Sequence, residues 1–239
     1  MDTLEKKYNI DVVFEDNHLI IINKKSGQIA QGDKTGDTAL NEILKAYLKE
    51  KYSKPGNVYL GLVHRLDRPT SGGIIFGKTD KATSRLSKMF QKHDLTKRYW
   101  AVVDNLPPQK EGVLEHFLKK DTKKNKSFVV KEDTPGAKKA SLSYKLIASS
   151  DRYHLLEIDL KTGRHHQIRT QLSAIDCRIK GDVKYGFKRA NRDLSIHLHA
   201  RYIKLIHPVQ KEEISFTFPV PEGDSVWTFF EKHALNTLK

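Results

Sequence analysis

The stretch His64-Arg-Leu-Asp-Arg-Pro-Thr-Ser-Gly-Gly73 places one carboxylate, Asp67, between two arginines and directly before a turn sequence. The apolar runs 60–63 before it and 74–76 after it are typical of buried strands. Asp67 therefore lies in a turn between two core strands, where a side chain is held rigidly and still reaches the surface. Two interpretations follow from these residues: a functional carboxylate, or an aspartate that accepts backbone hydrogen bonds within its own turn.

Outward from this turn, the hydrophobic pattern predicts mostly hairpin-connected strands. Tyr99, Ala101 and Val103 alternate with Trp100 and Val102, which indicates a strand over 97–103. The other predicted strands cover 10–15, 18–23, 113–118, 128–130, 141–147, 153–160, 201–206 and 213–218. The predicted helices are one capped by Asp37 or Thr38, and those at 80–91, 168–175 and 227–238. We expect an α+β fold: a single catalytic domain over 1–239, built on a largely antiparallel mixed sheet with flanking helices.

Charge composition points to a polyanionic partner. The 239 residues include 43 Lys and Arg against 29 Asp and Glu, for a net charge of +14. Nucleic acid is the usual partner of such a surface, although a basic protein without a polyanionic partner is the alternative. The lone Cys177 excludes an intramolecular disulfide, and neither a signal peptide nor an apolar run of about 18 residues is visible. We expect a reduced, cytoplasmic protein without a membrane partner.

A second polar cluster, Lys161-Thr-Gly-Arg-His-His-Gln-Ile-Arg169, follows one predicted strand and opens a helix. Backbone N–H groups at such a helix end suit a phosphate or a carboxylate, and the alternative is a solvated basic helix start. His165, His166 and Asp182 also suggest a metal site. Adjacent histidines on a helix point about 100° apart, however, so we predict that no metal binds there.

Sequence motifs for cofactor chemistry are missing. No Gly-x-Gly-x-x-Gly follows a strand, and neither a Gly-Lys-Ser/Thr loop nor a Gly-x-Ser-x-Gly motif occurs. We therefore expect no nucleotide cofactor, and no cofactor of any other kind.

The stretch 64–73 resembles the catalytic motif of RNA pseudouridine synthases of the ribosomal large-subunit type, in the classes termed A, C and D. Other segments resemble that family's further motifs in the same order, between about residue 10 and residue 220: 19–27, 95–103, 160–169, 181–186, 198–200 and 207–208. The resemblance implies the pseudouridine synthase fold and an RNA-modifying isomerase. Because strand signals begin near residue 8, we expect no S4-like RNA-binding domain at the N-terminus. Lys25 and Arg178 stand where the family pattern has proline.

Residue roles follow from the same resemblance. Asp67 is the expected nucleophile, Arg169 its ionic partner, and Tyr99 the residue that stacks on the uracil and takes the carbon 5 proton. Arg65 is expected to fill the space left by the flipped nucleotide. The residues expected to contact RNA are His64, Arg65, Arg68, Lys119, Lys120, Lys123, Lys124, Arg164 and His165.

Elementary chemistry agrees with these roles. A carboxylate nucleophile splits a glycosidic rearrangement into two steps without a metal, and a neighbouring guanidinium lowers its pKa. The sequence leaves open whether Asp67 attacks the sugar C1′ or the uracil ring. It also leaves open an idle RNA-binding or ribosome-assembly factor on the same fold. A metal-dependent nuclease is disfavoured, because no clustered carboxylates occur. We expect a monomer that acts on ribosomal large-subunit RNA as the first choice and on tRNA as the second.

Overall fold

The computed structural model describes residues 2–32 and 36–237. The chain divides into two compact units, each drawing on two separate stretches of sequence. The first unit combines Met1–Thr96 with Ala200–Pro219, and the second combines Lys97–His199 with Val220–Lys239. The expectation of a single catalytic domain over the whole chain stays a prediction.

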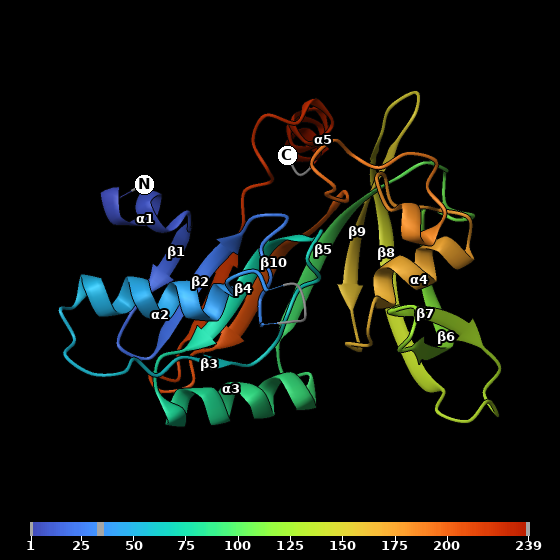
Figure 1. Ribbon diagram of the computed structural model, residues 1–239. Helices are drawn as coiled ribbons and strands as arrows, with labels where there is room; N and C mark the ends of the chain where they lie inside the picture. Colours follow the sequence, from blue (N-terminus) through green and yellow to red (C-terminus); the bar gives the residue numbers. More distant parts are fainter. Residues whose placement is uncertain (1, 33–35, 238–239) are drawn as a thin grey trace. The chain divides into compact units, whose positions relative to one another are not determined.

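In the first unit, antiparallel hairpins build the sheet, as the alternating pattern predicts. Strands β1 (Val12–Glu15) and β2 (Leu19–Lys24) form the N-terminal hairpin, and β2 pairs with β4 (Ser71–Gly77). Most of β10 (Leu198–Ile206) lies next to β4 and pairs with β11 (Glu213–Thr217) on its other side (Figure 1). The short strand β3 (Gly61–Leu62) also pairs with β4. Asp67 therefore lies in the connection between two paired strands.

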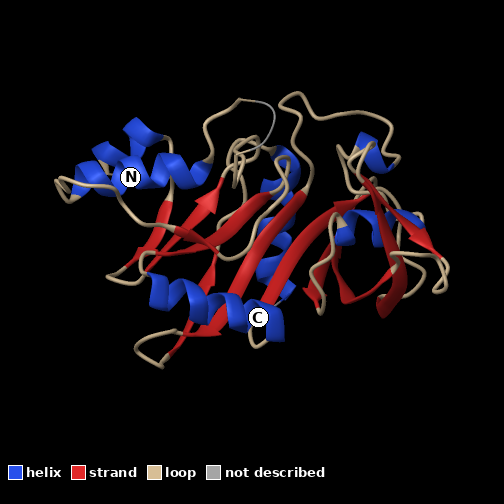
Figure 2. Cartoon of the chain, turned by 60° about the horizontal axis from the view of Figure 1, so that its bottom comes forward, coloured by secondary structure: helices blue, strands red, loops and turns tan. Residues whose placement is uncertain are grey.

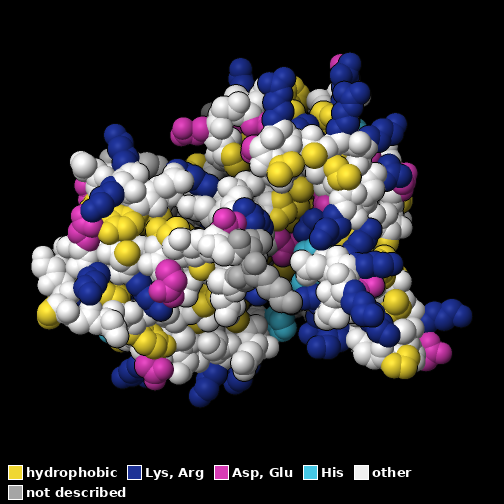
Figure 3. Space-filling view, in the orientation of Figure 1, with side chains coloured by type: hydrophobic (Ala, Val, Ile, Leu, Met, Phe, Trp, Pro, Cys, Tyr) yellow, Lys and Arg dark blue, Asp and Glu magenta, His cyan; other side chains and the backbone are white. Residues whose placement is uncertain are grey.

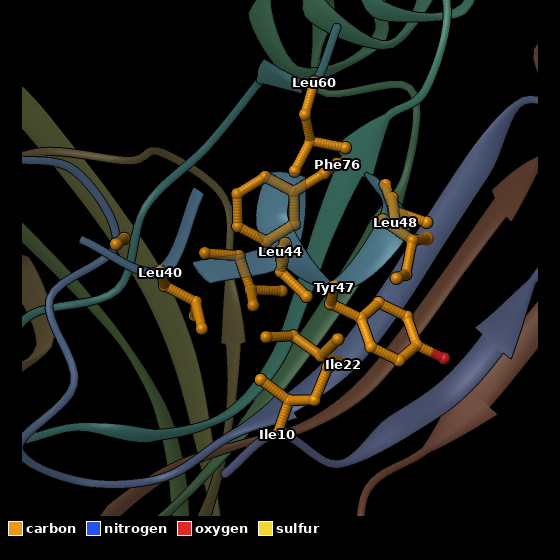
Figure 4. Close-up of a cluster of buried hydrophobic side chains, with 11 residues drawn as sticks. Ile10, Ile22, Leu40, Leu44, Tyr47, Leu48, Leu60 and Phe76 are labelled. Carbon is orange, nitrogen blue, oxygen red and sulfur yellow. The ribbon is translucent and has the colours of Figure 1, made fainter. Parts of the chain in front are cut away.

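Helices cover both faces of this sheet (Figure 2). Helices α1 (Thr3–Tyr8) and α2 (Leu40–Lys51) pack on one face, and α3 (Asp80–Lys92) packs on the other. Side chains of α2 such as Leu44 and Tyr47 meet Ile22 of β2 and Phe76 of β4 in a closed apolar cluster (Figure 4). Because β4 is buried on both faces, the turn that precedes it has a rigid base.

A close backbone approach fixes the start of β4. Gly72 has a φ of +110°, which favours glycine, and a Cβ there would lie 2.4 Å from the carbonyl oxygen of Ala200. At Gly73, a Cβ would lie 2.0 Å from the ring of Phe218. The two glycines after the Asp67 turn therefore let Ala200 of β10, and Phe218 directly after β11, pack against the backbone of β4.

In the second unit, five antiparallel strands follow the order β5 (Thr96–Val103), β9 (His154–Leu160), β8 (Lys138–Ser149), β6 (Glu111–Asp121), β7 (Lys126–Val130). Trp100 and Val102 pack with Trp227 and Phe230 of α5 (Ser225–Thr237). The predicted alternation then directs Tyr99 to the opposite face of β5. Helix α4 (Gln167–Ala174) and the short η1 helix (Val183–Tyr185) complete the unit.

Two local features differ from the sequence-based expectation. Helix α1 was not predicted, and α2 begins after Ala39, so neither Asp37 nor Thr38 is its cap. The Leu40 N–H instead donates to the carbonyl of Ile29 at 2.8 Å, so a tertiary contact replaces the side-chain cap. The predicted end of the last helix at residue 238 lies outside the described residues. Within residues 2–32 and 36–237, no helix has the length and apolar character needed to span a bilayer.

Candidate active site

The turn that carries Asp67 is fastened to the neighbouring strand. The Thr70 N–H donates to the Asp67 carbonyl at 3.0 Å, which closes the turn. The Lys24 ammonium donates to the carbonyl oxygens of Arg68 at 3.3 Å and Thr70 at 2.6 Å. One lysine side chain therefore holds the backbone on the C-terminal side of the carboxylate. Asp67 itself is half-buried.

Lys24 is a functional candidate that sequence reasoning missed. It lies on β2 at the same alternation as Ile20 and Ile22, both of which face the apolar cluster under α2, and it is only 1% exposed. Burial lowers the pKa of the Lys24 ammonium to about 7, and the Asp67 carboxylate acts in the opposite direction. The sequence feature that indicates this role is a lysine at a core position of a strand, because a buried lysine side chain needs dedicated hydrogen-bond partners.

The neighbours of Asp67 divide into an inward and an outward set. His64 points inward: its Nε2 accepts from the Ile75 N–H at 3.0 Å and its ring stacks on Phe90 at 4.4 Å. Arg65 and Arg68 are exposed, and Arg68 pairs with Asp37 at 2.8 Å. The two arginines thus keep the exposure that an RNA contact requires, whereas His64 braces the strands. Their roles as RNA contacts stay predictions.

In the second unit, Arg169 and Asp182 form a buried ion pair. The Arg169 Nε lies 2.6 Å from Asp182 Oδ2, and Nη2 lies 2.8 Å from Oδ1. Arg169 is 5% exposed and Asp182 is 1% exposed. The two-pronged contact fixes the plane of the guanidinium. From the sequence, Asp182 was considered only as a metal ligand. Its role as the partner of Arg169 was missed, although an arginine that is buried needs a buried carboxylate beside it.

Tyr185 extends this polar core. Its ring centroid lies 5.0 Å from the Arg169 guanidinium carbon, within the range of a cation–π contact. Its hydroxyl accepts from the Ser127 N–H at 2.8 Å and lies 2.9 Å from His166 Nδ1. Burial raises the pKa of the Tyr185 hydroxyl, so it stays neutral near pH 7. Tyr185 therefore links α4 to the β6–β7 hairpin.

Tyr99 lies on β5, where it pairs with Ile158 of β9. It is 7% exposed, so most of its ring is packed and only a small part reaches the surface. Packing of this kind holds an aromatic ring in one orientation, as stacking on a base would require. Its expected role in base stacking and proton removal stays a prediction.

The tip of the β6–β7 hairpin has hydrogen-bond partners on neighbouring residues and on the segment before α4. His165 lies between Ser127, whose Oγ is 2.9 Å from Nδ1, and Asn125, whose Oδ1 is 3.1 Å from Nε2. The Lys124 N–H donates to Asp121 Oδ1 at 2.9 Å within the turn. His165 therefore fastens the hairpin to the start of α4 in addition to its predicted role toward RNA.

Exposed cations surround this hairpin. Figure 3 shows dark-blue side chains gathered over the region where Figure 1 places β6 and β7. The predicted RNA contacts in this unit that are exposed are Lys119, Lys120, Lys123, Lys124 and Arg164. The Arg164 Nε donates to the Lys139 carbonyl at 2.9 Å. The backbone N–H of Arg164 donates to Gln167 Oε1 at 2.9 Å. This N–H, just before the start of α4, therefore already has a partner within the protein.

The two positions without the family's proline use their backbone N–H groups. The Lys25 N–H donates to Gln28 Oε1 at 3.0 Å, and the Arg178 N–H donates to Asp104 Oδ1 at 2.8 Å. Arg178 also pairs with Asp104 and Asp176. Proline has no N–H, so hydrogen bonds replace ring rigidity at both positions.

The predicted catalytic residues come from different units: Asp67 from the first, Tyr99 and Arg169 from the second. The pairing of Asp67 with Arg169 stays a prediction. In the described part of the chain, no three His, Cys, Asp or Glu side chains are grouped so as to hold a metal ion. The rings of His165 and His166 stack on each other at 3.8 Å.

Comparisons with known proteins converge on one family. The family described as RNA pseudouridylate synthase matches residues 18–174. Ribosomal large subunit pseudouridine synthase D of Zymomonas mobilis is 32% identical over 225 residues, which cover 89% of this chain and 70% of the relative. tRNA pseudouridine synthase C of Pectobacterium carotovorum is 28% identical over 86% of this chain and 58% of its own length. The solved structure of human RNA pseudouridylate synthase domain containing 4 aligns with a TM-score of 0.76 and 25% identity, covering 98% of this chain and 95% of that one.

Proposed function

Because this chain belongs to the RNA pseudouridylate synthase family, we propose that it isomerises specific uridines of ribosomal large-subunit RNA, with tRNA as the second choice of substrate. The relative named for the large subunit is 32% identical to this chain, and the relative named for tRNA is 28% identical. That difference supports the order of the two choices.

The reaction exchanges one bond for another without any co-reactant. The bond from uracil N1 to the sugar C1′ breaks, the uracil turns, and a bond from carbon 5 to C1′ forms. The carbon 5 proton is lost to a base, and N1 gains a proton. In our proposal the Asp67 carboxylate forms the covalent intermediate and Arg169 keeps that carboxylate ionised. Tyr99 stacks on the uracil and removes the carbon 5 proton.

One observation carries this proposal: Asp67 lies in a turn that is held from β2 by Lys24 and continues into the buried strand β4. A nucleophile needs a fixed approach to its target, and the rigid strand supplies it. The test is to map pseudouridine in ribosomal RNA and tRNA from cells with and without this protein. The proposal requires at least one uridine whose modification disappears with the protein.

The same mapping separates the isomerase from the idle RNA-binding factor that the sequence left open. An idle factor on this fold would leave every pseudouridine in place when it is removed. Restoring the protein as an Asp67→Asn variant adds a control, because an idle factor would not distinguish this variant from the parent.

We propose that the protein acts as a monomer in the cytoplasm. The single cysteine, Cys177, is buried, which suits a reducing compartment. Burial raises the pKa of the Cys177 thiol to about 11, so it stays protonated near pH 7.

Replacing Arg169 with lysine is expected to lower turnover about 100-fold at saturating RNA. Lysine keeps the charge but cannot bind both oxygens of Asp182, so the cation loses its fixed position. Tritium release from carbon 5 measures the change. Arg152→Lys, an exposed arginine in the β8–β9 turn, is the matched control and should behave like the parent. Turnover of Arg169→Lys within about twofold of the parent would contradict a positioning role for the two-pronged contact of the Arg169 guanidinium.

Serine in place of Lys119, Lys120, Lys123 and Lys124 is expected to weaken RNA binding and reduce its salt dependence. Each phosphate contact releases counterions, so each lysine removed should lower the slope of log affinity against log salt by about one. The choice of uridine should not change, because phosphates carry no sequence information. Filter binding at several salt concentrations gives the slope. An unchanged slope together with modification of different uridines would mean that these lysines read bases.

A further inference from the structure

An aromatic side chain stands among the cations of the β6–β7 hairpin. Phe128 of β7 is 38% exposed, whereas its neighbour Ser127 is only 2% exposed and faces α4. Strand alternation therefore directs the Phe128 ring away from α4, toward solvent. A ring in this position forgoes part of the free energy that burial would supply, so packing alone does not explain an aromatic residue there.

Three lysines frame the Phe128 ring. The Lys126 ammonium lies 5.4 Å from the ring centroid and the Lys124 ammonium lies 6.0 Å from it. Lys119 is the cross-strand partner of Phe128 and therefore lies on the same face of the hairpin. Both ammonium groups lie over the ring, as in a cation–π contact, and fit a nucleobase that takes the ring face while its backbone phosphates bind the displaced cations.

The ring is also mounted rigidly. Directly before Phe128, the Ser127 N–H donates to the Tyr185 hydroxyl and the Ser127 hydroxyl donates to the His165 carbonyl, each at 2.8 Å. The Lys184 ammonium donates to the Asn125 carbonyl at 3.3 Å. Because the opposite face of the hairpin is fastened to α4 and η1, little conformational entropy is lost when a base stacks on Phe128.

A continuous set of contacts joins this ring to the predicted catalytic arginine. The Lys126 ammonium lies 4.9 Å from the Tyr185 ring centroid as well as near Phe128. The Tyr185 ring in turn lies against the Arg169 guanidinium. Lys126 therefore links the exposed Phe128 ring to the packed group of side chains around Arg169.

We propose that Phe128 is a stacking platform for an unpaired nucleobase of the RNA substrate, with Lys119, Lys124 and Lys126 binding the flanking phosphates. This inference rests on the proposed function and deepens it, because it requires a substrate with single-stranded nucleotides outside the reacting uridine. A paired base presents no free face, so duplex RNA cannot use the platform. Stacking accepts every base, so the platform adds affinity without choosing sequence.

The test compares Phe128→Leu, Phe128→Trp and a matched control, Val129→Ala. Leucine keeps an apolar side chain but loses the flat ring. Val129 is the next residue on the strand, is 41% exposed and points to the other side. We expect Phe128→Leu to weaken binding of a single-stranded oligonucleotide about tenfold, and Phe128→Trp to bind like the parent. The Phe128→Leu salt slope should equal that of the parent, because no charge is removed.

Tryptophan fluorescence gives a second readout. The native Trp100 and Trp227 are 5% and 3% exposed, so the signal of the tryptophan that Phe128→Trp adds is read as the difference from the parent. We expect the single-stranded oligonucleotide to quench this difference signal and an RNA duplex to leave it unchanged. Equal affinity of Phe128→Leu and the parent, or a Phe128→Trp signal that single strands do not quench, would overturn the platform.

Activity assays separate this inference from the proposed function. If the parent converts uridine in RNA and Phe128→Leu matches it in KM and kcat, the platform is wrong and the function stands. If the parent converts no uridine but single strands quench Phe128→Trp, the function is wrong and the platform stands. The combination that supports both is a KM raised about tenfold in Phe128→Leu with kcat kept.

Discussion

Asp67→Asn is expected to bind RNA like the parent and to release tritium from carbon 5 at less than about one-thousandth of the parent rate. Asparagine nearly preserves the shape of the side chain, and Asp67 is only half-buried in its turn, so the fold should survive. The amide cannot form the covalent intermediate. Loss of one negative charge from a basic surface should leave RNA binding equal or slightly tighter.

Filter binding, thermal unfolding and tritium release are measured on the same preparation of Asp67→Asn. The matched control is Asp37→Asn, which removes an exposed carboxylate paired with Arg68 and should keep full activity. Tritium release by Asp67→Asn at a rate comparable to the parent would falsify the nucleophile assignment.

Asp182→Asn is expected to produce the largest loss of stability, about 3 to 5 kcal/mol. Asp182 and Arg169 are both buried, and the change removes the charge of the carboxylate that binds the guanidinium through two hydrogen bonds in a place that water does not reach. For a chain of this size the melting temperature should fall by about 6 to 20 °C. Thermal unfolding followed by circular dichroism measures the shift.

Two comparisons make this result specific. Asp151→Asn, at an exposed position in the β8–β9 turn, should melt within about 1 °C of the parent. The double variant Arg169→Met with Asp182→Leu should be more stable than Asp182→Asn alone, because no buried charge is left unpaired. A melting temperature of Asp182→Asn within about 2 °C of the parent would mean that the pair does not hold the structure together.

Patterns local in sequence predicted most of the fold. The alternation around Tyr99 placed β5 correctly, with Trp100 and Val102 on the face that packs against α5. Hairpins such as β8–β9 followed from apolar runs around a polar turn, and the α+β class with an antiparallel sheet was confirmed. These features are set by neighbours within a few residues, which a single sequence displays directly.

The errors came from partners that are distant in sequence. Helix α2 starts without a side-chain cap because the Ile29 carbonyl accepts from its first N–H. Asp182 lies 13 residues from Arg169, and only the folded loop brings the two together. Lys24 holds carbonyl oxygens 44 and 46 residues away, a contact that no local pattern encodes. Tertiary contacts of this kind decide which polar residues are buried.

For the candidate site, the sequence predicted the residue types better than their surroundings. Asp67, Tyr99 and Arg169 were selected from motifs, and the structure adds the groups that hold two of them: Lys24 for the Asp67 turn and Asp182 for Arg169. His165 was predicted as an RNA contact, and the structure gives it a second role as the fastening of the hairpin. A polar residue that the sequence predicts as an RNA contact can thus also hold a structural element in place.

The most direct test of uridine isomerisation follows two products at once. Purified protein is incubated with RNA that carries tritium at carbon 5 of its uridines and that comes from cells lacking this protein, in the presence of a chelator. We predict that tritium release and pseudouridine formation rise together, one for one, with the RNA strands intact. Strand cleavage, or tritium release without pseudouridine, would contradict it.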